Sequence, residues 1–173
     1  MFEIEKVKKI ILDVPNFPKE GIIFKDITPI FKHPDVLDEI ITQMSKIAST
    51  IDFDVIVAPE SRGYLFGVPL ALKMNKPFVF ARKKGKLPRE TVSVAYQLEY
   101  NVAEIEIHKQ DILQGQKVLI VDDLLATGGT IHAIEELIQK MGAKPVGNIF
   151  LIELGFLNGE TKLIAKTHAL IKY

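Results

Sequence analysis

One segment, residues 118–130, constrains the fold of this chain more than any other. It reads V-L-I-V-D-D-L-L-A-T-G-G-T, so an apolar run leads into two aspartates and then into two glycines. A helical pattern follows, and one face of it carries Ile131, Ile134, Leu137, Ile138 and Met141. A buried strand that ends in carboxylates and turns through glycines into a helix is typical of an α/β sheet, where ligands bind at the carboxyl ends of strands.

The rest of the chain repeats this alternation of strand and helix. Apolar runs predict strands at 55–58, 77–81 and 145–154, and a helix is expected over 65–74. Two more strands are expected at 93–100 and 103–107, joined through Asn101. The pattern predicts an open, mostly parallel α/β sheet flanked by helices, in one domain of residues 1–173.

The N-terminal part and the C-terminal tail are less regular. Val7, Ile10, Ile11 and Val14 recur at helical spacing, so we expect a short helix that ends before Pro15. Residues 16–29 are rich in proline and are expected to be mostly loop, and a second helix is expected to begin near Pro34. The tail, residues 161–173, is expected to complete the sheet.

Composition excludes several classes of protein. The chain has 22 basic and 22 acidic residues, whereas nucleic-acid binders usually carry a basic excess. It has no cysteine, which rules out disulfides, thiolate metal sites and cysteine nucleophiles. No apolar run approaches the roughly 18 residues of a membrane helix. We expect a cytoplasmic protein with neither a nucleic-acid nor a membrane partner, and its zero net charge is compatible with an oligomer.

The glycine-rich segment suits a ligand that carries both phosphate and hydroxyl groups. Glycines admit a close approach, and the unpaired N–H groups of a helix start bind anions. Carboxylates such as Asp122 and Asp123 suit sugar hydroxyls or a hydrated Mg²⁺ instead. Together these features predict a ribose phosphate site. The plainer alternative is that Thr127 or Thr130 is only a helix N-cap, but this explains one threonine and neither aspartate.

This segment resembles the signature of type I phosphoribosyltransferases, which bind phosphoribosyl pyrophosphate (PRPP), and D-D-L-L-A-T-G-G-T resembles their adenine-specific branch. The resemblance implies transfer of the phosphoribosyl group of PRPP to adenine, giving AMP and pyrophosphate, with Mg²⁺ held mainly by PRPP and water. It implies that Asp122 and Asp123 bind the ribose, and it implies a homodimer. The residues implied for the 5′-phosphate are Ala126, Thr127, Gly128, Gly129 and Thr130.

A second group of residues is implied for the base. Residues 15–30 are similar to the base-binding hood of the adenine enzymes, in which the residues matching Ile23, Phe24 and Lys25 enclose adenine. Phe24 offers an aromatic face to a flat heterocycle. Leu154 matches another position that touches the base. The plainer alternative is that the apolar members of this group are local core residues.

Two further segments are implied for pyrophosphate. Residues 59–64, P-E-S-R-G-Y, look like the family's pyrophosphate loop, in which Arg62 presents a planar donor fork and Gly63 permits close approach. The resemblance also implies a cis peptide bond, here Glu60–Ser61. The charge run at 82–91 resembles the flexible catalytic loop, and its pyrophosphate-binding residues are Arg82, Lys83 and Lys86. The alternative for this run is an ordinary solvated loop.

The catalytic residue implied by the resemblance is Glu99, within Q-L-E-Y at 97–100. A carboxyl group there can exchange a proton with the purine nitrogen. The alternative is a glutamate on an exposed hairpin. The four histidines show no metal-ligand spacing, and we expect most of them at the surface or in turns.

Two other functions stay open. A transferase for another purine base usually carries an acid where this chain has Ala126. A non-catalytic regulator that senses PRPP and binds nucleic acid would share the fold, but the neutral charge and the short first helix disfavour it.

Overall fold

The computed structural model describes residues 3–97 and 102–173, and the chain divides into two compact units, residues 1–43 and 44–173. Within the described residues, no helix is both long and apolar enough to cross a membrane. Each unit is described below by itself.

The N-terminal unit is built around a two-stranded hairpin. Helix α1, Ile4–Ile10, leads into β1, Leu12–Pro15, which pairs antiparallel with β2, Ile23–Asp26. A 3₁₀ helix, η1, spans Thr28–Lys32, and α2 spans Pro34–Ala48 across the boundary between the units. The turn between β1 and β2 is held by a hydrogen bond from the Gly21 N–H to the Asn16 side chain, 2.9 Å long.

This hairpin corrects two of the sequence predictions. The expected helix does not continue to Val14, because Val14 pairs with Phe24 in the hairpin. The expected loop at 16–29 is wrong over Ile23–Asp26, which is strand β2. The spacing of Val7, Ile10, Ile11 and Val14 is that of a helix, but the conformation of Val14 is decided by its pairing with Phe24 across the hairpin, which the spacing does not encode. The start of α2 at Pro34 is confirmed.

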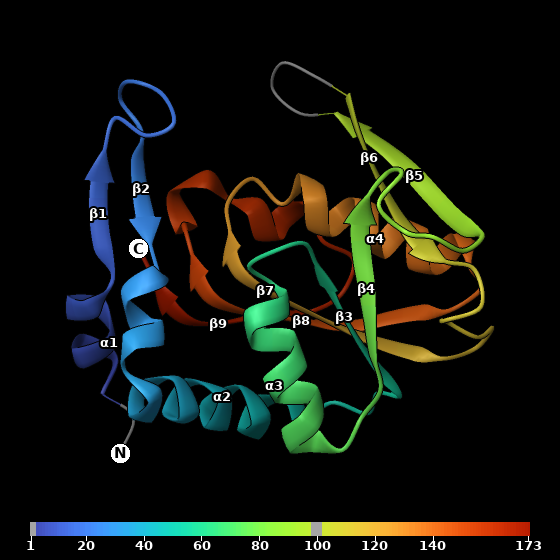
Figure 1. Ribbon diagram of the computed structural model, residues 1–173, viewed down its shortest axis with the longest axis horizontal. Coiled ribbons are helices and arrows are strands. Elements are labelled where there is room, and N and C mark those ends of the chain that lie inside the picture. The colour runs from blue at the N-terminus through green and yellow to red at the C-terminus, as the bar shows by residue number, and fades with distance from the viewer. Residues whose placement is uncertain (1–2, 98–101) are drawn as a thin grey trace. The chain divides into compact units, whose positions relative to one another are not determined.

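The C-terminal unit contains a seven-stranded sheet in the order β5-β6-β4-β3-β7-β8-β9 (Figure 1). Its strands are β3 Val55–Pro59, β4 Phe78–Lys83, β5 Thr91–Gln97, β6 Val102–His108, β7 Lys117–Leu125, β8 Lys144–Glu153 and β9 Thr167–Lys172. The five strands from β4 to β9 in this order are parallel, and the hairpin β5–β6 joins β4 antiparallel. The predicted open, mostly parallel α/β sheet is confirmed, and β9 confirms that the tail completes it.

Two helices cover opposite faces of this sheet (Figure 1). Helix α3, Tyr64–Met74, connects β3 to β4, and α4, Gly129–Lys140, connects β7 to β8. The first connection moves toward one edge of the sheet and the second toward the other, so right-handed crossovers must place the two helices on different faces. The order of the strands therefore reverses between β3 and β7, and a crevice forms outside the carboxyl ends of strands at such a point.

The main core lies under α4. The apolar stripe predicted for this helix is buried except for Met141, which follows the last residue of α4 and is partly buried. Ile134, Leu137 and Ile138 are fully enclosed against side chains from one face of the sheet, including Val57 and Ile120. One histidine departs from the expectation of surface positions. His108 at the end of β6 is buried, because it contacts the side chains of Arg89 and Asp111.

Candidate active site

A cleft of about 670 Å³ opens where the order of the strands reverses. It is formed by the connection that follows β3 and by the connection that follows β7, two adjacent parallel strands. The residues that line it are Pro59, Glu60, Ser61, Arg62, Lys83, Lys86, Asp122, Asp123, Leu124, Leu125, Ala126, Thr127, Gly128, Gly129, Thr130 and Ile131.

The two aspartates form the floor of this cleft. Strand β7 continues beyond the predicted end at residue 121 to Leu125, so both aspartates are part of the strand. The Asp123 N–H donates to Asp122 Oδ1 over 2.8 Å, and Arg62 Nε lies 3.0 Å from Asp123 Oδ2. Burial, reinforced by the neighbouring charge of Asp123, raises the pKa of Asp122 well above its usual value. The site thus holds acidic groups in a partly enclosed position beside a single arginine.

This raised pKa predicts how stability depends on pH in an Asp122→Asn variant. Aspartates of an unfolded chain titrate near pH 3.9. Because the folded protein keeps the Asp122 proton to higher pH, the stabilisation from this group is complete below about pH 3.9 and is lost as the pH rises through the raised pKa. We therefore expect the variant to exceed wild type in free energy of unfolding at pH 7–8, with the gain shrinking toward pH 4. Urea unfolding across this range measures it, and a gain that does not vary with pH would contradict the assignment.

The loop after β7 carries the glycines into α4. Gly128 is the N-cap of α4 and has a φ of +80°, a conformation that L side chains rarely adopt. No side chain caps the N-terminus of this helix. The alternative in which Thr127 or Thr130 serves only as an N-cap is therefore wrong. The first residues of α4 line the cleft together with the two threonines, and the unpaired N–H groups of a helix start are suited to an anion.

The connection after β3 supplies the opposite wall. The peptide bond Glu60–Ser61 is cis, as the resemblance implied. Gly63 lies so close to its surroundings that an added Cβ would be 2.7 Å from the Pro59 carbonyl oxygen and 2.9 Å from Asp122 Oδ1. The two walls of the cleft therefore meet at a position that only glycine can occupy.

Comparison with known proteins bears on this geometry. A family model described as a phosphoribosyl transferase domain matches residues 26–164. An adenine phosphoribosyltransferase of Ureaplasma parvum is 49% identical over 173 residues, which is 100% of both chains. The chain belongs to the adenine phosphoribosyltransferase family. A crystal structure of the enzyme from Thermoanaerobacter pseudethanolicus has a TM-score of 0.96 at 48% identity and covers 99% of this chain and 100% of its own.

A second solved structure carries ligands. The adenine phosphoribosyltransferase of Saccharomyces cerevisiae, complexed with an imino-altritol bisphosphate and adenine, has a TM-score of 0.91 at 40% identity. It covers 97% of this chain and 98% of its own. The fold of this chain is therefore that of type I phosphoribosyltransferases along almost its whole length.

Most of the residues expected from the family for PRPP come together in the cleft, and the exceptions are Gly63 and Arg82, which are not among the residues that line it. Lys83 and Lys86 line it, as do Arg62 and all residues from 122 to 130. Arg82 is not among the lining residues, because its Nε and Nη2 atoms donate to Glu60 Oε2 over 3.0 and 2.8 Å.

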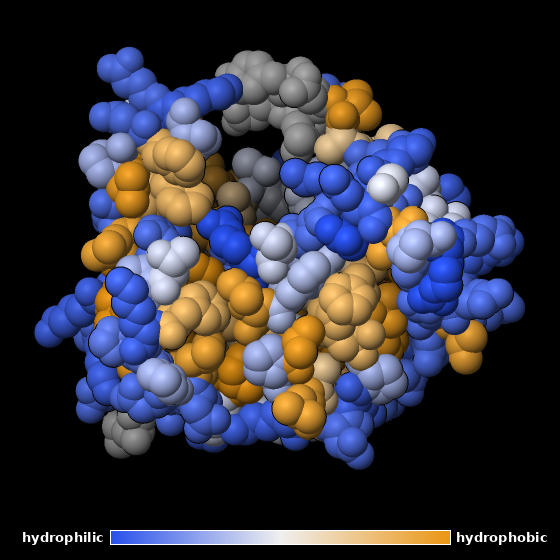
Figure 2. Space-filling view, viewed as in Figure 1, coloured by the Kyte–Doolittle hydropathy of each residue, from blue (hydrophilic) through white to orange (hydrophobic). Residues whose placement is uncertain are grey.

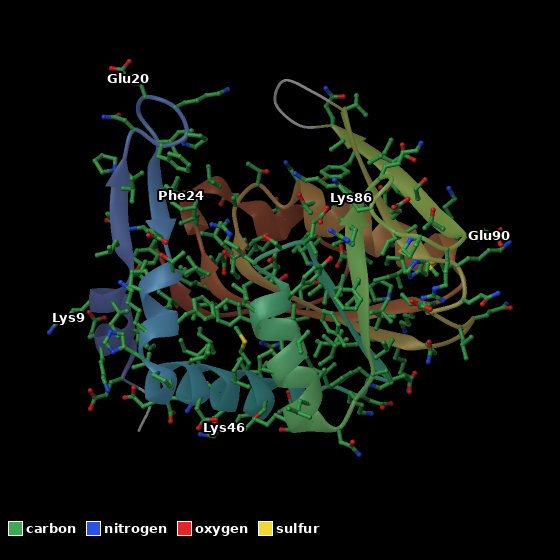
Figure 3. All side chains as sticks on the ribbon, viewed as in Figure 1. Lys9, Glu20, Phe24, Lys46, Lys86 and Glu90 are labelled. Carbon is green, nitrogen blue, oxygen red and sulfur yellow. The ribbon has the colours of Figure 1, made fainter. Side chains whose placement is uncertain are left out.

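The charge run at 82–91 is more structured than a solvated loop. Its first two residues belong to β4, its last residue, Thr91, begins β5, and several residues between them are hydrogen-bonded to β6. Glu106 Oε1 accepts from the N–H groups of Lys86 and Leu87, both over 3.1 Å. Lys86 lies beside the carboxyl end of β4, whereas Glu90 lies at the outer end of the hairpin β5–β6 (Figure 3).

The residues expected to touch the base are divided between the two units. In the N-terminal unit, Ile23 is exposed, and the ring of Phe24 packs edge-on against that of Phe17, with 5.1 Å between the ring centroids. Lys25 Nζ lies 2.6 Å from Asp13 Oδ1. In the C-terminal unit, Leu154 follows β8 and its N–H donates to the Leu125 carbonyl over 2.9 Å.

The expected catalytic residue, Glu99, lies outside the described residues. Its hairpin is described up to Gln97 on one side and from Val102 on the other.

Sequence reasoning missed two acidic residues that organise the site. Glu60 accepts from the Lys83 N–H over 2.8 Å as well as from Arg82, so it joins the cis peptide to the end of β4. These contacts hold the pKa of Glu60 below its usual value against the opposing effect of burial. Glu106 is buried and fixes the position of Lys86. The position of Glu60 within the pyrophosphate motif at 59–64 was the only sequence signal for either residue.

Proposed function

We propose that the cleft between β3 and β7 is the place where this chain binds PRPP and transfers its phosphoribosyl group to adenine, giving AMP and pyrophosphate. The reaction is that of an adenine phosphoribosyltransferase, the step of purine salvage that forms AMP. In this proposal the loop 126–130 binds the 5′-phosphate, and Asp122 and Asp123 bind the ribose hydroxyls. Pyrophosphate binds to Arg62, Gly63, Lys83 and Lys86, with Arg82 adding its charge.

The observation that carries this proposal is that anion-binding groups and carboxylates line the same cleft. Anion-binding groups come from the start of α4 on one side and from Arg62 with two lysines on the other. The two carboxylates belong to the same lining. A ligand that carries both phosphate and hydroxyl groups matches this set of side chains, and PRPP is such a ligand.

The geometry indicates how these residues serve the transfer. The purine nitrogen forms a bond to the anomeric carbon as the bond from that carbon to pyrophosphate breaks, and the bonding electrons leave with pyrophosphate. Arg62, Lys83 and Lys86 stabilise the charge that develops on the leaving group. The purine nitrogen gives up a proton, and we propose Glu99 as the group that exchanges it. Adenine is proposed to contact Ile23, Phe24, Lys25 and Leu154, as the resemblance implies.

Magnesium fits the chemistry of the cleft. Asp122 and Asp123 supply hard carboxylate oxygens, which Mg²⁺ prefers, directly or through water. Among the described residues, no group of three or more histidines, aspartates or glutamates is arranged to hold a metal ion. We propose that Mg²⁺ is bound mainly by PRPP oxygens and water, with the two aspartates nearby. When bound, the ion would neutralise part of the charge of the pyrophosphate.

We also propose that the protein is a homodimer. Helix α3 exposes apolar side chains, and Figure 2 shows hydrophobic atoms over this helix. Leu72 is 83% exposed, and Leu65 and Val68 are more than two-fifths exposed on the same helix. Because a face of this kind is costly to leave in water, a second copy of the chain is the partner we propose for it.

The proposal is tested by an assay with labelled bases. Purified protein, PRPP and Mg²⁺ are incubated separately with adenine, hypoxanthine, guanine, xanthine and uracil, and nucleotide formation is counted against controls without PRPP and with EDTA. We expect conversion of adenine alone, dependent on both PRPP and Mg²⁺. Preference for another base would overturn the assignment of the hood. Binding of PRPP without conversion of any base would favour the regulator instead.

A further inference from the structure

We propose that Gly159 is a positioning residue for the 5′-phosphate, because the segment 154–165 forms a fixed support against which the loop 126–130 is folded. The inference deepens the function proposed above and rests on it. Apart from Leu154, neither the motifs nor the family signature include this segment, which connects β8 to β9 and contains two short 3₁₀ helices, η2 at Gly155–Leu157 and η3 at Gly159–Lys162.

The contact between the two segments is backbone against backbone. A Cβ added to Gly159 would be 2.1 Å from the Ala126 carbonyl oxygen and 3.1 Å from the Gly128 nitrogen. A Cβ added to Gly128 would be 2.5 Å from the Gly159 carbonyl oxygen. Because real Cβ atoms essentially never approach other atoms closer than 3.0 Å, neither glycine can be replaced unless a backbone segment moves.

The first end of the supporting segment is tied to the sheet. The Leu154 N–H donates to the Leu125 carbonyl, and the Gly155 N–H donates to the carbonyl of Tyr173 at the end of the chain, both over 2.9 Å. The segment therefore begins in a fixed position beside β7, the strand from which the phosphate loop emerges.

The second end is tied to α4 by a fully buried carboxylate. Glu135 Oε2 accepts from the Ile164 N–H over 2.8 Å, and Glu135 Oε1 accepts from the Ala165 N–H over 2.9 Å. Oε1 also accepts from Asn148 Nδ2 over 2.9 Å. A buried carboxylate is expensive unless it is well hydrogen-bonded, so this arrangement fixes the backbone at 164–165 firmly.

The turn that presents Gly159 is also held locally. Asn158 adopts the left-handed conformation with a φ of 51°, and its carbonyl accepts from both the N–H and the hydroxyl of Thr161, over 3.2 and 2.7 Å. Since the support is anchored at both ends and at its turn, an added methyl group at Gly159 would displace the phosphate loop rather than the support. The N–H groups of that loop would then lose their alignment with the 5′-phosphate.

Equilibrium binding of AMP and adenosine to the intact protein tests this inference, because the two ligands differ only in the 5′-phosphate. For Gly159→Ala we expect AMP affinity to fall about 10- to 100-fold, the effect of misaligning a charge-assisted hydrogen bond, with adenosine affinity close to wild type. The matched control is Gly155→Ala in the same segment, where an added Cβ would be 3.4 Å from the nearest atom, the Tyr173 carbonyl oxygen. It should retain wild-type affinity for both ligands.

A second variant keeps the test informative if Gly159→Ala fails to fold. Glu135→Gln replaces one acceptor oxygen by a donor and so releases one of the two backbone N–H groups at 164–165. We expect a several-fold loss of AMP affinity with adenosine affinity retained. Wild-type ratios of AMP to adenosine affinity in the variants would overturn the role of the support. A wild-type protein that itself does not prefer AMP to adenosine would instead overturn the proposed phosphate site.

Discussion

Glu99→Gln should lower the turnover of AMP synthesis by about 10²–10⁴-fold, the usual effect of removing a general acid or base. The amide has nearly the shape of the carboxylate but cannot accept the proton of the purine nitrogen. Because Glu99 is not proposed to bind PRPP, the affinity for PRPP should stay close to wild type. Steady-state rates at saturating substrate and equilibrium binding of PRPP separate the two effects.

The matched control for this variant is Glu90→Gln. Glu90 comes directly before β5 and lies at the outer end of the hairpin, and its carboxylate pairs with the exposed Lys109, at 2.7 Å. Exposed pairs of this kind contribute little, so the control should turn over at the wild-type rate. Near-normal turnover in Glu99→Gln would remove this residue from the catalytic role.

Gly63→Ala should lower kcat/KM for PRPP by about 10²-fold, as expected for a displacement on the order of 1 Å within an active site. The added methyl group would lie 2.7 Å from the Pro59 carbonyl oxygen and 2.9 Å from Asp122 Oδ1. It would therefore displace both the proposed pyrophosphate site and the proposed ribose site. Initial rates at varied PRPP concentration measure the effect.

The unfolding midpoint shows whether Gly63→Ala acts on the site alone. Gly155→Ala again serves as the control, because its methyl group meets nothing closer than 3.4 Å. If Gly63→Ala keeps both its stability and its kcat/KM, the close approach of the two walls has no bearing on PRPP.

The sheet and the centre of the site could be predicted because both depend on local patterns. The run at 118–121 is apolar enough to be a buried strand, and the aspartates and glycines that follow it leave few alternatives for the chemistry. The motif at 59–64 was equally informative, and the cis bond between Glu60 and Ser61 follows the family pattern.

The remaining features depend on contacts that no local pattern encodes. Val14 lies in a strand because Phe24, ten residues away, pairs with it. Arg82 is directed to Glu60, which is 22 residues distant in the sequence and adjacent only because β3 and β4 are neighbours. The approach of Gly159 to Ala126 depends on the folded positions of two connections, and an isolated glycine in a polar segment gives no sign of it.

The most direct test of this account is a crystal structure of the protein with AMP bound. We predict that the 5′-phosphate lies against the N–H groups of residues 127–130, with the ribose hydroxyls donating to Asp122 and Asp123. This result would place the phosphoribosyl group in the cleft at the carboxyl ends of β3 and β7. AMP bound elsewhere, with this cleft containing only solvent, would contradict the central claim.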